Sequence, residues 1–205
     1  MTDSDPFRTT PAGRLTRQRA GGRSELVRAN VAEAVLSFMR EGKTDFSVAE
    51  VAERADVHRT TIYRWWPTRV DLYREALTVR GARFTLQDTG SWRGDVPVAM
   101  ATLAAFLADP VEVALTAAFA THNDPEGNLV QIEYWAPILE QLKRVVHRGL
   151  GRGEVRADTD PETAALLMVS PITTYALAYR CQPPQALLSS LSQGIIRAFS
   201  IDGRN

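Results

Sequence analysis

Apolar positions recur at helical spacing along most of the chain. From Ser24 onward they occupy one side of a helical repeat, and charged residues occupy the other side. The apolar members of this first repeat are Val27, Val31, Ala34, Val35 and Phe38. Glycine readily adopts the positive φ that ends a helix, and Gly42 follows the repeat. The pattern predicts a helix that begins at Ser24 and ends before Gly42.

Two short helices separated by a tight break are expected next. Ser47 and Glu50 have the spacing of a capping box, in which each side chain binds the backbone N–H of the other residue. Asp56 tolerates left-handed backbone and marks the break, and His58 begins the second short helix. Pro67 disfavours helical backbone at the preceding residue and so ends that helix. The arrangement is a helix-turn-helix at about residues 47–66.

The remainder of the chain also has helical patterning. Thr68 and Asp71 form another capping box that starts a helix through Val79. Asp95 is positioned to cap a helix over 96–108, and Asp160 precedes a proline at a helix start. Further helices are expected over 110–121, after Pro125 to about 150, from 161 and over 184–199. No alternating pattern of useful length indicates a strand, so the predicted fold class is all-α.

One side of the helix after His58 carries polar side chains that suit DNA. Ile62 and Trp66 are four residues apart and are expected to face the core. The opposite side carries Arg59, Thr60 and Tyr63, with Thr61 beside them. A guanidinium can bond guanine, hydroxyls and methyls suit base edges, and a phenol can reach a phosphate. Arg69, in the first turn of the next helix, adds a cation beside backbone N–H groups that attract phosphate. The alternative is a solvated polar face on a small helical domain.

These residues resemble a known family. The segment 47–57, and the run Thr61-Ile62-Tyr63-Arg64 followed by Trp66-Pro67-Thr68-Arg69, look like the DNA-binding domain of the TetR family of transcriptional regulators. The resemblance covers about residues 24–80. It implies that bases are read by Arg59, Thr60 and Thr61, and that the DNA backbone is held by Tyr63, Trp65 and Arg69. For Trp65, inward packing beside Trp66 stays open as an alternative.

The resemblance also implies an organisation and a mechanism. Members of the family are α-helical homodimers, usually repressors, whose C-terminal domain binds a ligand that releases the DNA. We therefore expect a helix-turn-helix DNA-binding domain at 24–70 and an effector-binding and dimerisation domain at 71–205. One short helix reads few base pairs, whereas two helices about 34–36 Å apart read a palindrome. The expected partners are double-stranded operator DNA, a small-molecule effector and a second copy of the chain.

Four positions depart from the usual residues of the family. Asp56 stands where the family usually has glycine, and His58 stands where a serine cap is usual. Each of these two changes could weaken the turn or the cap by ~1 kcal/mol. Trp66 and Arg69 replace the common phenylalanine and lysine.

Charge is balanced over the whole chain but not along it. The 205 residues include 24 Lys+Arg and 24 Asp+Glu, so the net charge is zero. The chain as a whole therefore has no positive field that would attract a polyanion such as DNA. From Arg8 to Arg28, however, there are six arginines and one acid, Glu25. Residues 1–23 offer almost nothing to bury and are expected to form a flexible basic arm. Whether this arm lies along DNA or is only a solubilising tail stays open.

The C-terminal part offers candidates for an effector cavity and a dimer interface. The side chains that could enclose an apolar ligand are Phe106, Phe119, Tyr134, Trp135 and Met168, although plain core is the commoner role of such residues. Glu133, His122 and Arg144 could serve as charged anchors, but the composition favours a mainly hydrophobic effector. The apolar segments 163–179 and 184–199 could pair with those of a second copy as a four-helix interface.

Catalytic, metal and membrane roles are not indicated. His58, His122 and His147 lack metal-ligand spacing with one another and with Cys181, the single cysteine. No motif for a catalytic serine or a phosphate-binding loop is present. The longest apolar segment, 163–179, is shorter than the ~20 residues of a membrane helix. We expect a soluble cytoplasmic protein that is not an enzyme and that has no cofactor or metal.

Three functions fit these observations. The favoured hypothesis is a sequence-specific regulator, a repressor released from a palindromic operator by a small hydrophobic effector. The alternative from a different class is a helical small-molecule-binding protein or enzyme with a non-functional helix-turn-helix. A third hypothesis is a constitutive DNA-binding protein without an effector.

Overall fold

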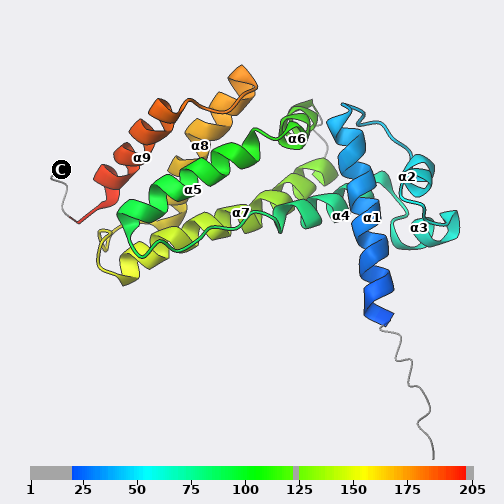
Figure 1. Cartoon of the computed structure of the whole chain (residues 1–205), viewed down its shortest axis with the longest axis horizontal. Coiled ribbons are helices and arrows are strands. Elements are labelled where there is room, and N and C mark those ends of the chain that lie inside the picture. Colours follow the sequence, from blue (N-terminus) through cyan, green and yellow to red (C-terminus); the bar gives the residue numbers. More distant parts are fainter. Residues whose placement is uncertain (1–19, 122–124, 202–205) are drawn as a thin grey trace, which may run out of the picture.

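The computed structural model describes residues 20–121 and 125–201, and it describes their side chains except at 20–23, 116–121 and 125–128. Within these ranges the backbone forms helices and no strand, with one isolated bridge between Val155 and Ser200. The all-α prediction is therefore confirmed. The helices in chain order are α1 (Ala20–Arg40), α2 (Val48–Arg54), α3 (Arg59–Trp65), α4 (Arg69–Gly81), α5 (Trp92–Leu107), α6 (Pro110–Thr121), α7 (Pro125–Gly151), α8 (Pro161–Tyr179) and α9 (Gln185–Phe199) (Figure 1). Residues 1–19 of the predicted arm and His122 lie outside the described residues. The prediction that the arm extends to residue 23 is wrong, because α1 begins at Ala20, four residues before the predicted start.

The N-terminal helices pack around α1. This helix lies against α2, α4 and α6, and α2 lies against α3. In Figure 1, α2 and α3 are at one end of the molecule and α8 and α9 are toward the other end. The aromatic rings of Phe38 and Phe46 stack 5.3 Å apart, and Val51 and Ile62 are fully buried. The apolar faces predicted from helical spacing thus form the core that supports α3.

The break between α2 and α3 has the predicted geometry. Asp56 has a φ of 53°, in the left-handed region. The Ser47 hydroxyl accepts the Glu50 N–H, and the Glu50 carboxylate accepts the Ser47 N–H, so the capping box of α2 is confirmed. His58 occupies the N-cap position of α3, but its side chain makes no capping hydrogen bond.

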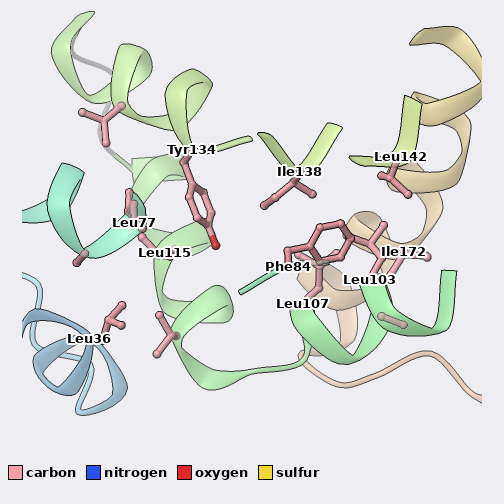
Figure 2. Packing of buried hydrophobic residues seen from close by; sticks show 14 of the residues in the cluster. Leu36, Leu77, Phe84, Leu103, Leu107, Leu115, Tyr134, Ile138, Leu142 and Ile172 are labelled. Carbon is pink, nitrogen blue, oxygen red and sulfur yellow. The ribbon is translucent and has the colours of Figure 1, made fainter. Parts of the chain in front are cut away.

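The C-terminal part is built around α7. This helix packs against α4, α5 and α8, while α9 packs against α5 and α8. Leu103, Ile138, Leu142 and Ile172 are fully buried between α5, α7 and α8, where Figure 2 shows their side chains. Asp160 caps α8 by accepting the N–H of Thr163, as the sequence predicts. The predicted starts of α6 and α8 and the predicted end of α9 match the observed bounds, and α7 begins at Pro125 itself.

The prediction that Asp95 caps α5 is wrong. Ser91 is the N-cap, and α5 begins four residues before the predicted position. The Asp95 carboxylate points inward instead, where it accepts the Thr89 N–H at 2.7 Å. It also pairs with two arginines of α7, Arg148 at 3.2 Å and Arg152 at 3.1 Å. Two cations on another helix outweigh the local capping tendency of the aspartate.

No helix within residues 20–121 and 125–201 has both the length and the apolar character needed to cross a bilayer. In the same ranges, no group of three or more His, Cys, Asp or Glu side chains could hold a metal ion.

Candidate DNA-binding surface and effector cavity

The polar residues of α3 stand at the molecular surface. Arg59 and Thr60 are exposed, Thr61 is partly exposed, and Tyr63 is 49% exposed. On the opposite side of the same helix, Ile62 is completely buried. Because the apolar side holds α3 against the core, the polar side is presented outward on a fixed support.

The two tryptophans at the end of α3 both contact the core. Trp66 is 4% exposed, and its indole N–H donates to the Glu75 carboxylate at 3.1 Å. Trp65 is partly buried, and its ring meets that of Trp66 edge-on at 5.5 Å. The Arg64 guanidinium lies 5.9 Å from the centre of the Trp65 ring. Trp65 thus packs inward beside Trp66, the arrangement that the sequence left open as an alternative.

The cations near α3 fall into two kinds. Arg54 pairs with Glu41 at 2.7 Å, and its guanidinium lies 3.6 Å from the centre of the Phe38 ring. The charge of Arg54 is therefore already paired with a residue of the protein. Arg59 and Arg69 are exposed, and neither makes an ion pair with a residue that the structure describes. Arg69 lies in the first turn of α4, next to the Thr68 side chain that caps this helix. These two guanidinium groups can therefore meet an external anion without breaking an ion pair of the described fold.

A cavity of about 500 Å³ opens between α6, α7 and α8. The described residues that line it are Glu112, Leu115, Gln131, Tyr134, Trp135, Val169, Ser170, Thr173, Thr174 and Leu177. Two of the five predicted effector residues, Tyr134 and Trp135, belong to this lining.

The other three predicted effector residues are not among the described lining residues. Met168 is completely buried in the core. The Phe106 ring packs edge-on against Phe84 at 5.3 Å. The backbone of Phe119 lies in α6, but its side chain is outside the described residues.

A buried charged cluster borders this cavity. The Arg80 guanidinium, near the end of α4, pairs with Glu112 at 2.9 Å and with Asp109 at 3.2 Å. The Tyr134 hydroxyl donates to the same Glu112 carboxylate. Figure 2 shows the Tyr134 side chain pointing from α7 into the interior. Burial raises the pKa of Glu112 above its usual value, although Tyr134 and Arg80 oppose this change, and burial also raises the pKa of Tyr134.

The sequence did not indicate this cluster. Glu112 stands in the first turn of a helix and Arg80 in the last turn of another, where acids and bases are ordinary. Of the anchors suggested from sequence, Glu133 is at the surface and pairs with Arg74 at 2.8 Å, and Arg144 is exposed.

Apolar side chains are exposed along α8. They are Leu166, Leu167, Leu177 and Tyr179, each 45–67% exposed. The exposed side of the neighbouring α9 carries small residues, which include Ala186, Ser190, Gly194 and Ala198. A side chain added at Gly194 would meet nothing within 4 Å. Exposed apolar side chains that gather on one surface are typical of sites that pair with another protein.

The chain is similar to proteins that regulate transcription. The family model described as the tetracyclin repressor-like C-terminal domain matches residues 86–194. The HTH-type transcriptional regulator AqdR of Rhodococcus erythropolis is 30% identical over 83% of this chain and 84% of that protein. The DNA-binding transcriptional repressor TetR of Mycobacteroides abscessus is 31% identical over 64% of this chain and 72% of that protein.

Solved structures with the same fold include a regulator with a bound ligand. The transcriptional regulator FadR of Bacillus subtilis, solved in complex with stearoyl-CoA, superposes with a TM-score of 0.66 at 16% identity. The match covers 82% of this chain and 97% of that chain.

Proposed function

The chain belongs to the TetR family of transcriptional regulators, and we propose that it represses transcription by binding an inverted-repeat operator as a homodimer. A small effector in the cavity between α6, α7 and α8 then releases the DNA. The observation that carries the DNA-binding part is the exposed polar side of α3 over the completely buried Ile62. The DNA-reading unit is residues 24–70 and the regulatory unit is residues 71–205, with α4 crossing the boundary.

In this proposal, some side chains in and next to α3 contact bases and others contact the DNA backbone. Arg59, Thr60 and Thr61 contact base edges in the major groove. Tyr63 and Arg69 bind phosphates at either side, which fixes the position of α3 on the duplex. Trp65, which packs beside Trp66 but is only partly buried, also contributes to the backbone contact.

Dimerisation through α8 and α9 supports this mode of binding. The exposed leucines of α8 and the small residues of α9 allow close packing against the same helices of a second copy. Two copies of α3 about 34–36 Å apart then meet successive major grooves on one side of the DNA.

The effector is proposed to be a small, mainly apolar molecule. The FadR structure with stearoyl-CoA supports a ligand role for this domain in a protein of the same fold. The cavity in this chain is of the size that small-molecule sites have, roughly 300–1,000 Å³. Because the protein acts on chromosomal DNA, we place it in the cytoplasm, and we assign it no catalytic role.

DNA binding by Arg59→Ala tests the proposal. A duplex is selected by the purified protein from a random-sequence pool, and the affinity is measured by fluorescence anisotropy at a fixed salt concentration. Loss of a bidentate base contact should weaken binding by roughly 10- to 100-fold. Arg83→Ala removes an equal charge from an exposed position outside α3 and should change the affinity by less than about twofold. Selection of no inverted repeat, or equal affinities of the Arg59→Ala and unaltered proteins, would contradict the proposed function.

A further inference from the structure

The orientation of α3 depends on contacts with the rest of the fold. The helix has seven residues and is about 10 Å long, too short to be stable by itself. It packs chiefly against α2, and Ile62 is its one fully buried side chain. The turn from α2 and the side chain of Ile62 hold the beginning and the middle of α3. The far end of the helix needs a separate anchor.

Trp66 provides this anchor at the end of α3. Its backbone leaves the helical conformation, with φ of −135° and ψ of 75°, and its side chain is 4% exposed. The indole N–H donates to the carboxylate of Glu75 in α4 at 3.1 Å. The Glu75 side chain is only 14% exposed, and a hydrogen bond to a charged group in such surroundings is strong and directional.

A second contact of the Glu75 carboxylate is weaker. The Arg28 guanidinium of α1 lies 3.8 Å from Glu75, and the Arg28 side chain is 59% exposed. An exposed ion pair at this distance contributes little to stability. The hydrogen bond from Trp66 is therefore the contact of Glu75 that fixes a direction.

The same helix carries a proposed phosphate contact. Arg69 lies in the first turn of α4, six residues before Glu75. The bond between Trp66 and Glu75 therefore sets the angle between α3 and the helix that bears Arg69. Hydrogen bonds to base edges require a narrow range of distances and angles, whereas attraction to phosphates tolerates a misplaced helix. A loose α3 would lose sequence discrimination before it lost general affinity for DNA.

We propose that Glu75 is a positioning residue for DNA recognition, which acts through Trp66 to hold α3 in a fixed orientation relative to Arg69. This inference rests on the proposed DNA-binding function and assigns part of its sequence specificity to a residue that does not touch DNA.

Trp66→Phe tests the inference by removing the donor while keeping an aromatic ring and every charge. The measured quantity is the ratio of the affinities for the selected duplex and for a scrambled duplex of equal length. Fluorescence anisotropy gives both affinities at a temperature at which circular dichroism shows each variant to be folded. The ratio should fall by roughly 5- to 20-fold, because base contacts are misaligned. The affinity for the scrambled duplex should change by less than about twofold, since phosphate contacts remain.

Trp92→Phe is the matched control. Trp92 is also buried, at the start of α5 beside Gly149 of α7, and its indole N–H has no hydrogen-bond partner among the described residues. The substitution removes the same atoms from the core but no bond to Glu75. It should leave the affinity ratio unchanged even if the free energy of unfolding falls. An equal loss of specificity in both variants would mean that a general loss of stability is the cause, and would overturn the inference.

Two substitutions of Glu75 separate the hydrogen bond from the charge. Glu75→Gln and Glu75→Leu remove the same charge, but only the glutamine oxygen can still accept the indole N–H. The glutamine variant should keep most of the specificity, and the leucine variant should match Trp66→Phe. Equal affinity ratios of the two Glu75 variants would overturn the inference. This comparison decides the question if Trp66→Phe does not fold.

The outcome for the unaltered protein distinguishes the two proposals. If it selects an inverted repeat and Trp66→Phe has an unchanged affinity ratio, the role of Glu75 is overturned and the regulator function stands. If it selects no inverted repeat, the proposed function is overturned and the inference falls with it.

Discussion

At the start of α5, the Asp95 carboxylate has no solvent exposure and is held by Arg148 and Arg152 of α7. Burial alone disfavours the ionised form, but the hydrogen bonds from Thr89 and Arg152 outweigh burial, so the pKa of Asp95 lies below its usual 3.8. Such a carboxyl stabilises the fold at pH values above its unfolded pKa. The stabilisation is lost as the pH falls through the folded pKa.

Replacing this aspartate should therefore have a pH-dependent effect on stability. We expect Asp95→Asn to lower the free energy of unfolding by roughly 1–3 kcal/mol at pH 7, because the two arginines lose their shared charge. The difference between the two proteins should shrink as the pH is lowered from about 5 toward 3. This difference in the free energy of unfolding is measured by urea titration, with circular dichroism as the signal. Asp158→Asn, at an exposed ion pair with Arg156, is the control and should change stability by less than about 0.5 kcal/mol. A difference that stays constant over this pH range would show that the ionised carboxylate is not responsible.

At the scale of single elements, α3 is a helix whose first turn lacks a side-chain cap. His58 has the extended backbone of an N-cap residue, with ψ of 135°, but contributes no capping hydrogen bond. A serine at this position can accept a backbone N–H of the first turn. We expect His58→Ser to raise the free energy of unfolding by about 1 kcal/mol relative to His58→Ala. The same urea titration measures this difference, and equal stabilities of the two variants would contradict it.

The elements were predictable from sequence where their signals are local. The caps formed by Ser47, Thr68 and Asp160 bind backbone groups three residues away, so the sequence spacing already contains the interaction. The error at Asp95 has the opposite origin. Its partner Arg148 is 53 positions away in sequence, and a short-range pattern carries no information about it.

The same distinction applies to the candidate site. The outward side of α3 follows from helical periodicity, and Arg59, Thr60 and Tyr63 have the exposure that the sequence predicts. Their contacts with DNA stay a prediction. The cavity depends on how α6, α7 and α8 pack, and of its described lining residues only Tyr134 and Trp135 were expected. The pairing of Arg80 with Glu112 joins residues 32 positions apart and could not be found from either segment alone.

At the scale of the whole molecule, the exposed leucines of α8 give the proposed dimer a direct test. Leu167 is 48% exposed, so a charge at this position costs the single chain little. We expect Leu167→Glu to convert the dimer to a monomer with unchanged helix content, because an unpaired carboxylate would be buried in the interface. Light scattering after size exclusion measures the mass.

The DNA affinity of the Leu167→Glu variant should fall together with its mass, since one copy of α3 reads only half of a palindrome. Val98→Glu, at an exposed apolar position of α5, serves as the control and should remain dimeric. If the Leu167→Glu protein is still a dimer, the interface does not include this side of α8.

The thirteen residues of α4 connect the two ends of the proposed mechanism in one stiff rod about 20 Å long. A tilt of roughly 6° about its Arg80 end displaces the Arg69 end by about 2 Å. In a two-fold dimer the displacement occurs twice, so the separation of the reading helices can change by about 4 Å against the ~34–36 Å repeat of the duplex. In the proposed mechanism the rod acts as a lever, through which a small movement at its Arg80 end is amplified into a geometric mismatch with DNA.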